Sequence, residues 1–138
     1  MRVFETIPHT ADIGLRVEAD TIVELFLGAL MGMGEILRRG VCESSTPFDV
    51  ARRIEVSSID ESSLLIDFLN EALAAASEEH AIFCEVDFDS LSNRRLVARI
   101  RGRSVDGFDR EIKAVTYHGS AIIRNEAGNL ETRVLFDI

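Results

Sequence analysis

The sequence predicts an α+β fold with one domain, in which two helices pack on one side of a mainly antiparallel or mixed β-sheet. Two segments have the apolar spacing of amphipathic helices, and both lie before residue 80. The remaining segments alternate apolar and polar residues, as strands do. The resulting order, ββαβα followed by four strands, is typical of α+β domains. A length of 138 residues fits one domain spanning 1–138.

The first elements form a strand pair and a helix. Residues 3–7 and 13–19 read as strands, separated by a turn at 9–12. Thr21 and Glu24 have the spacing of a capping box, so a helix is predicted to begin there. Its apolar stripe continues to Leu37. The helix is predicted to end at Arg38, Arg39 and Gly40, because the two arginine charges suit a helix C-terminus and glycine commonly follows one.

A loop, a strand and a second helix are expected next, at 41–50, 51–57 and 61–77. Ser58 or Asp60, or both, can cap this helix, because their side chains accept hydrogen bonds from the first turn. Asp67 and Glu71 lie four residues apart, away from the apolar stripe. We interpret them as a solvated helix face.

The second half of the chain reads as four strands, at 81–88, 94–103, 112–124 and 130–138. The third of these is long and is expected to be central. Residues 125–129 have hairpin-loop chemistry. If Arg124 faces Leu130, paired residue numbers sum to about 254. Asp137 then lies opposite Tyr117, or one position away if the register slips.

One strand carries the only basic stripe of an acidic protein. Its outward-facing residues include Arg95, Arg99, Arg101 and Arg103. Like charges keep an edge strand from pairing with other molecules, which is one interpretation. The other is a patch that binds an anion or an acidic partner. The sequence leaves both open.

Composition limits the class of protein. The net charge of −9 disfavours a free-standing nucleic-acid binder and suits a basic protein partner or a cation. No apolar run reaches the roughly 20 residues that span a bilayer, and no signal peptide is visible, so we expect a cytoplasmic protein without membrane contact. Cys42 and Cys84 form no CxxC motif, so a zinc or redox site is not expected. Cys84 is expected to be a small buried hydrophobe.

The chemistry of the chain rests on carboxylates, because no Walker A, GxGxxG, HExxH or GxSxG motif occurs. His118 is expected to be a core histidine. Asp12 and Asp137 lie at strand ends on the polar face, and Ile138 adds the terminal carboxylate. Oxygen ligands of this kind suit a hard cation such as Ca²⁺ or Mg²⁺. Separate, solvated carboxylates are the alternative.

Four segments resemble those of the archease family, and the resemblance covers essentially the whole chain. In chain order the segments are His9-Thr10-Ala11-Asp12-Ile13-Gly14, Leu64-Leu65-Ile66-Asp67-Phe68-Leu69-Asn70-Glu71, Ile112-Lys113-Ala114-Val115-Thr116-Tyr117-His118 and the final Asp137-Ile138. The segment before Ile112 departs from many archeases, because it is short and lacks a histidine. That departure leaves the cation site unaffected.

The resemblance implies a non-enzymatic activator of an RtcB-type RNA ligase, which joins tRNA halves with GTP and a divalent metal. It implies that the protein promotes ligase guanylylation and multiple turnover and reaches tRNA only through the ligase. It also implies a bound divalent cation, calcium in relatives with Mg²⁺ or Mn²⁺ as alternatives. The matching ligands are Asp12, Asp137 and Ile138. Lys113 and His9 match positions expected to act in partner binding or activation.

Two other classes remain from the sequence. One is an RNA-binding chaperone, or a modulator of a tRNA-modifying enzyme, that would use the arginine stripe. The other is a metal-dependent enzyme. The absence of a nucleophile–base pair argues against the enzyme.

Overall fold

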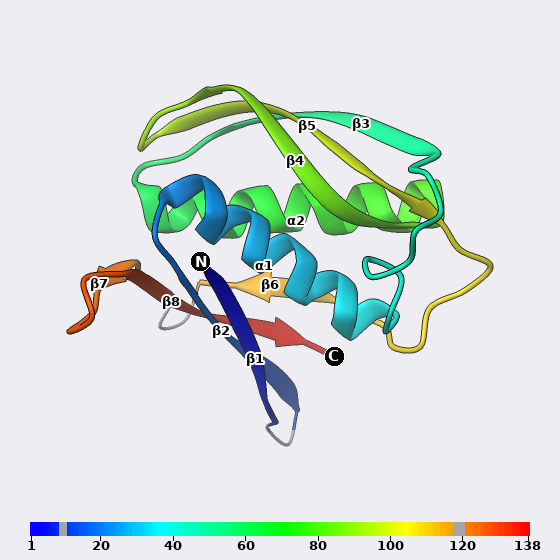
Figure 1. Ribbon diagram of the computed structural model, residues 1–138, viewed down its shortest axis with the longest axis horizontal. Coiled ribbons are helices and arrows are strands. Elements are labelled where there is room, and N and C mark those ends of the chain that lie inside the picture. Colours follow the sequence, from blue (N-terminus) through cyan, green and yellow to red (C-terminus); the bar gives the residue numbers. More distant parts are fainter. Residues whose placement is uncertain (9–10, 118–120) are drawn as a thin grey trace.

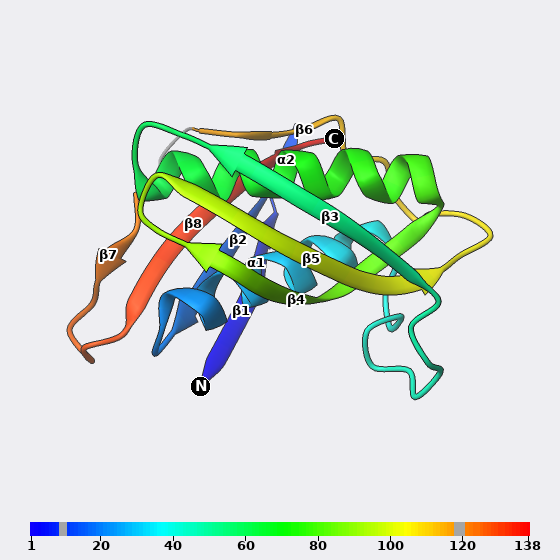
Figure 2. The same ribbon diagram turned by 90° about the horizontal axis from the view of Figure 1, so that it is seen from above.

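The computed structural model describes residues 1–8, 11–117 and 121–138, and Figures 1 and 2 show it in two views. His9 and His118, both named above, lie outside these residues. In chain order the elements are β1 (Arg2–Pro8), β2 (Asp12–Ala19), α1 (Ile22–Leu37), β3 (Val50–Ser57), α2 (Glu61–Glu79), β4 (Ala81–Leu91), β5 (Arg95–Ser104), β6 (Ala114–Thr116), β7 (Ile123–Arg124) and β8 (Leu130–Asp137).

The strands form two antiparallel sheets with the two helices between them (Figure 1). One sheet has the order β1-β2-β8-β6, with β7 also paired to β8, and the other has the order β3-β5-β4. The α+β class is therefore confirmed, but the helices have a sheet on both sides. The reason is visible in α1, whose buried residues surround most of the helix and require cover on more than one side.

Helix α1 begins as its sequence predicts and packs closely on β2. The Thr21 hydroxyl accepts a hydrogen bond from the backbone N–H of Glu24 at 3.2 Å. A Cβ at Gly32 would lie 2.6 Å from Leu15, and one at Gly28 would lie 2.9 Å from Val17. These glycines let the helix approach the sheet more closely than any larger residue would allow.

Helix α2 is capped by Asp60, whose carboxylate accepts from the N–H of Ser63 at 2.7 Å. It ends at His80, which adopts the left-handed conformation at φ 53°. Between the layers, the ring of Phe26 lies 5.6 Å from Phe68 and 5.9 Å from Phe88. These aromatic contacts join both helices to β4. No helix in the described part of the chain has the length and apolarity needed to cross a membrane.

The prediction of one long strand at 112–124 is wrong. Two short strands, β6 and β7, replace it, and both pair with the middle of the sheet at β8. Arg124 does face Leu130, so the hairpin register is confirmed at its base. Further along, Ala114 instead of Tyr117 faces Asp137. The pairing sum falls from 254 to 251, because the chain between β7 and β6 is three residues longer than the matching stretch of β8.

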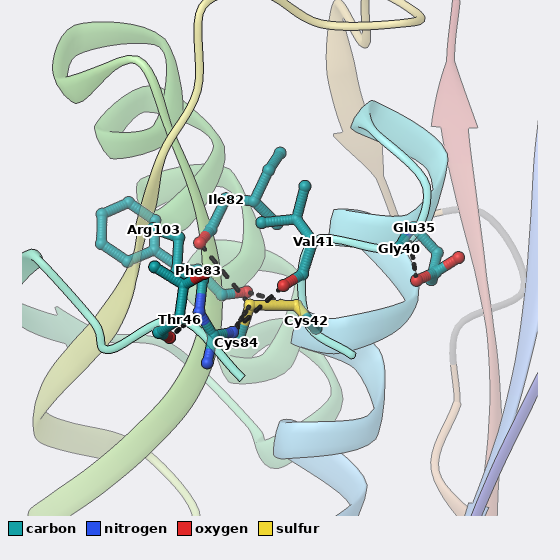
Figure 3. The surroundings of a disulfide bond; sticks show 9 residues. All are labelled: Glu35, Gly40, Val41, Cys42, Thr46, Ile82, Phe83, Cys84 and Arg103. Atoms are coloured by element: carbon teal, nitrogen blue, oxygen red, sulfur yellow. Dashed lines mark hydrogen bonds between the residues drawn. A yellow bond between two sulfur atoms is a disulfide. The ribbon is translucent and has the colours of Figure 1, made fainter. Parts of the chain in front are cut away.

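The cysteines also differ from expectation, because Cys42 and Cys84 form a disulfide (Figure 3). Their Cα atoms lie 5.3 Å apart although the residues are 42 positions apart in sequence. The bond ties the loop after α1 to β4. Arg103 holds the same loop, since its guanidinium donates to the Val41 carbonyl at 3.1 Å and to the Thr46 carbonyl. Spacing alone could not reveal this pairing.

Candidate functional site

Three of the four segments singled out in the sequence meet, in their described residues, at one end of the five-stranded sheet, and the helix segment contacts one of them. Asp12, at the start of β2, lies directly opposite Asp137, at the end of β8. On the other side of β8, Ala114 is the partner of Asp137. The backbone N–H of Lys113 donates to the Asp137 carbonyl at 2.7 Å. The first and last parts of the chain and the β6 segment therefore meet at one point.

The two aspartates share the outer face of the sheet, which no helix covers. Directly opposed residues in an antiparallel pair have Cβ atoms roughly 4.5–5.5 Å apart, and like charges at that spacing are destabilising. Asp12 is half-buried with one carboxylate oxygen enclosed, whereas Asp137 is exposed. A cation between them would offset the repulsion.

The donor set fits a hard cation but forms only part of a coordination shell. Calcium takes six to eight oxygen ligands. Within the described ranges, no three His, Cys, Asp or Glu residues converge on a metal position. Two side-chain carboxylates and the adjacent carboxylate of Ile138 would leave positions for water or for a partner's oxygens. Lys113 is exposed beside this pair.

Helix α2 holds β6 in place through Asn70. The Asn70 amide donates to the Val115 carbonyl at 2.9 Å and accepts from the Val115 N–H at 2.9 Å. The two bonds satisfy backbone groups of β6, an edge strand, as a further neighbouring strand would do. Because β6 flanks Asp137, Asn70 fixes the backbone next to the carboxylates.

A second link runs from α2 through Asp67, which is not the solvated residue that its spacing suggested. Its carboxylate accepts hydrogen bonds from the hydroxyls of Ser58 and Tyr117. The bond to Asp67, aided by partial burial, raises the pKa of the Tyr117 phenol. Glu71 is exposed, as expected. The helix motif therefore acts on the β6 segment, a role that helical periodicity could not reveal.

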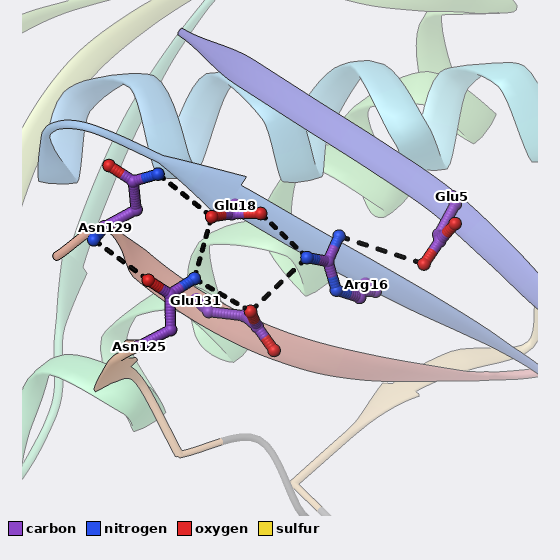
Figure 4. Close-up of polar contacts among 6 residues, drawn as sticks. All are labelled: Glu5, Arg16, Glu18, Asn125, Asn129 and Glu131. Carbon is purple, nitrogen blue, oxygen red and sulfur yellow. Dashed lines mark hydrogen bonds and ion pairs between the residues drawn. The ribbon is translucent and has the colours of Figure 1, made fainter. Parts of the chain in front are cut away.

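The opposite end of the same outer face carries a satisfied polar network (Figure 4). Arg16 pairs with Glu18 at 2.7 Å and with Glu131 at 3.4 Å. The amides of Asn125 and Asn129 donate to Glu18 at 2.7 Å and 2.9 Å. These bonds, with that from Arg16, lower the pKa of Glu18. Both acids already accept hydrogen bonds from arginine and asparagine side chains, and so they are poor candidates for a cation site.

The arginine stripe lies on β5, which is the middle strand of its sheet, so the edge-strand interpretation is wrong. Two of its four arginines are paired with acids on the neighbouring strands. Arg95 pairs with Glu55, and Arg101 pairs with Asp87. Arg103 is used to hold a loop, as described above. Within the described residues, two of the four arginines therefore form cross-strand ion pairs, one holds a loop, and Arg99 makes neither kind of contact.

Comparison with known proteins agrees with this arrangement. The sequence model of the Archease protein family (MTH1598/TM1083) matches residues 4–138. "Protein archease" from Methanothermobacter thermautotrophicus is 31% identical over 145 residues, covering 100% of both chains. "Protein archease" from Methanosarcina barkeri is 30% identical over 143 residues, covering 98% of this chain and 95% of the relative.

Solved structures show the same fold. The solution structure of Methanobacterium thermoautotrophicum protein 1598 superimposes with a TM-score of 0.75 at 31% identity, covering 98% of each chain. The crystal structure of a Thermotoga maritima archease, described as a possible chaperone, gives 0.65 at 24% identity and covers 97% of this chain and 96% of that one. With a full-length family match and relatives above 30% identity, this chain belongs to the archease family.

Proposed function

We propose that this chain is a non-enzymatic activator of an RtcB-type RNA ligase in tRNA splicing and RNA repair. It promotes guanylylation of the ligase and its multiple turnover, and it reaches tRNA only through the ligase. The proposal is supported by one observation above all: Asp12 pairs with Asp137 beside the β6 segment, and Asn70 of the helix segment binds β6. The description of the Thermotoga maritima relative as a possible chaperone agrees with a role on another protein.

The working part of this activator is a divalent cation held by Asp12, Asp137 and the carboxylate of Ile138. Calcium suits these oxygen donors best, and Mg²⁺ or Mn²⁺ are the alternatives. When bound, such a cation would supply positive charge for the partner's carboxylate or phosphate oxygens, and Asp12, Asp137 and the Ile138 carboxylate would hold it. Lys113 lies exposed beside the pair and is proposed to contact the ligase. His9 belongs to the same motif and keeps its proposed role in activation.

The charge of the chain supports a protein partner over RNA. A net charge of −9 repels a phosphate backbone, and most of the arginine stripe is engaged in ion pairs or loop contacts. An RNA-binding chaperone would need a free basic surface. The activator proposal therefore predicts no shift of tRNA by the protein alone at moderate salt.

We propose a cytoplasmic location, as the partner requires. Disulfides are rare in a reducing cytosol. The Cys42–Cys84 pair is then expected to be reduced in cells that keep such a cytosol, and alkylation of thiols before lysis measures its state. A fully oxidised pair in freshly alkylated mesophilic cells would contradict the proposed location.

A guanylylation assay tests the function directly. Labelled GTP is incubated with an RtcB-type ligase alone, with the wild-type protein, and with Asp137→Ala. We expect the wild type to increase the ligase–guanylate product and Asp137→Ala to remove the increase. Asp89→Ala is the matched control, because Asp89 is an exposed acid elsewhere on the molecule. Full stimulation by folded Asp137→Ala would refute the proposal.

The terminal carboxylate has its own test. A Gly-Ser extension after Ile138 converts that carboxylate into an amide and leaves both aspartates in place. Calcium affinity is expected to fall, as a titration would measure. Unchanged affinity would remove Ile138 from the ligand set while leaving Asp12 and Asp137 in it.

A further inference from the structure

Beside the carboxylate pair, on the inner side of the same sheet end, lies an open cavity of about 810 Å³. Its floor is apolar, and its rim is charged. Phe4, Ile13 and Ile138 are partly exposed on the floor, next to the buried Ile36. Because Ile138 belongs to both regions, anything that fills this cavity lies next to the proposed cation.

The acidic groups on the rim already have donors. The Glu35 carboxylate accepts from the N–H of Gly40 at 3.1 Å, and the Asp109 carboxylate accepts from the N–H of Arg39 at 3.2 Å. Glu5 lies 3.8 Å from the Arg16 guanidinium. These carboxylates are therefore not the groups that most need an external partner.

Two guanidiniums on the same rim are different. Arg39 and Arg110 are exposed, and within the described residues neither side chain makes an ion pair or a hydrogen bond. The backbone brings them together, because the N–H groups of Asp109 and Arg110 donate to the Leu37 carbonyl at 2.7 Å and 3.4 Å. The chain has 24 acidic residues, yet among the described residues none pairs with these two guanidiniums, which line the same cavity. A guanidinium binds a carboxylate through two parallel hydrogen bonds.

The cavity also runs along the outer edge of β1, which pairs with no other strand among the described residues. β1 is the terminal strand of its sheet and keeps a regular register with β2 over all seven residues. Consecutive strand residues point to opposite faces, yet Phe4, Glu5 and Thr6 all line the cavity. The cavity therefore touches the edge of β1 as well as its inner face. An extended peptide can add to such an edge through main-chain hydrogen bonds.

We infer that this β1 groove, formed by β1, the end of α1 and residues 109–110, docks an extended segment of the partner protein that places an apolar side chain on the floor and a carboxylate against Arg39 and Arg110. The lining has three acids and two arginines, so it would not attract a polyanion such as RNA. A single carboxylate beside an apolar residue matches it. This inference rests on the proposed function, since the partner is the ligase.

Binding of the purified RtcB-type ligase tests the groove. Affinity is measured for the wild type, for Arg39→Glu/Arg110→Glu, and for Arg94→Glu/Arg99→Glu. The last variant makes the same charge change at two exposed arginines, one on β5 of the far sheet and one in the turn before it. We expect the groove variant to bind at least about tenfold more weakly and the control to stay within about twofold. Hydrogen exchange in residues 2–8 should also slow when the ligase is added to the wild type.

Several results would overturn the inference. If both variants lose the same ligase affinity, net charge alone explains the loss and no groove is needed. If neither loses affinity, the groove is not the docking site. Loss of tRNA binding with unchanged ligase affinity would make the arginines an RNA site. If Asp137→Ala abolishes stimulation while the groove variant binds normally, the groove fails and the proposed function survives. If the wild type neither binds nor stimulates the ligase, both fail.

Discussion

Asn70 carries the clearest mechanical prediction, because one side chain supports the backbone beside the carboxylates. Asn70→Ala removes two hydrogen bonds to Val115, each 2.9 Å long. Val115 is 3% exposed, so its N–H and carbonyl would lose their partner in a largely buried position. Each lost bond costs about 1 kcal/mol, and more if the backbone group stays unpaired. We expect the free energy of unfolding to fall by about 2–4 kcal/mol.

Urea unfolding measures this loss, and a calcium titration of the folded variant measures its consequence. Since β6 flanks Asp137, loosening it should weaken calcium binding even though no ligand is removed. Glu71→Ala is the control, because Glu71 is the exposed neighbouring residue of the same helix. Asn70→Ala with unchanged stability and unchanged calcium affinity would refute the argument that α2 positions the site.

Three further predictions concern charge and cross-links. Because the pKa of Glu18 is lower in the folded protein than its unfolded value near 4.5, the stability that its carboxylate contributes is fully present above pH 4.5 and is lost as pH falls through the folded pKa. When the urea midpoint is plotted against pH, Glu18→Gln should therefore reduce its fall at acid pH. An unchanged fall would contradict this. Reducing the Cys42–Cys84 bond should lower the free energy of unfolding by about 4 kcal/mol, given the 42-residue separation, and Cys42→Ser/Cys84→Ser should be insensitive to reductant. Asp137→Asn should have opposite effects with and without calcium. In EDTA it removes like-charge repulsion and raises the thermal midpoint. At a hundredfold excess of calcium over Kd, binding adds about 2.7 kcal/mol to the wild type and nothing to a variant that binds none, so the order of the midpoints should reverse. The same order of midpoints in both conditions would count against a shared cation.

Local patterns predicted most elements because each depends on nearby residues. The Thr21 cap, the helix stripes and the 125–129 hairpin are all local, and the structure confirms them. The placement of Asp12 opposite Asp137 is not local, since 125 positions separate them, and strand patterns do not state which strands are neighbours. Their strand-end positions left a shared cation and separate carboxylates both open, and the resemblance to a family favoured the shared cation.

The failures share a physical cause, which is that they depend on contacts between distant segments. Alternation could not detect the extra residues between β6 and β7, so the register beyond Arg124 was misplaced by three. Nor could spacing pair Cys42 with Cys84 across two elements. Asp67 looked solvated because its partners, Ser58 and Tyr117, come from other segments.

We propose that Asp12 and Asp137, which lie opposite each other next to β6, share one divalent cation. Isothermal titration of the metal-free protein with calcium tests it most directly. The account predicts one site per chain in the wild type and in Asp89→Asn, and no measurable site in Asp137→Asn. A wild-type isotherm without binding, or equal binding by folded Asp137→Asn, would contradict it.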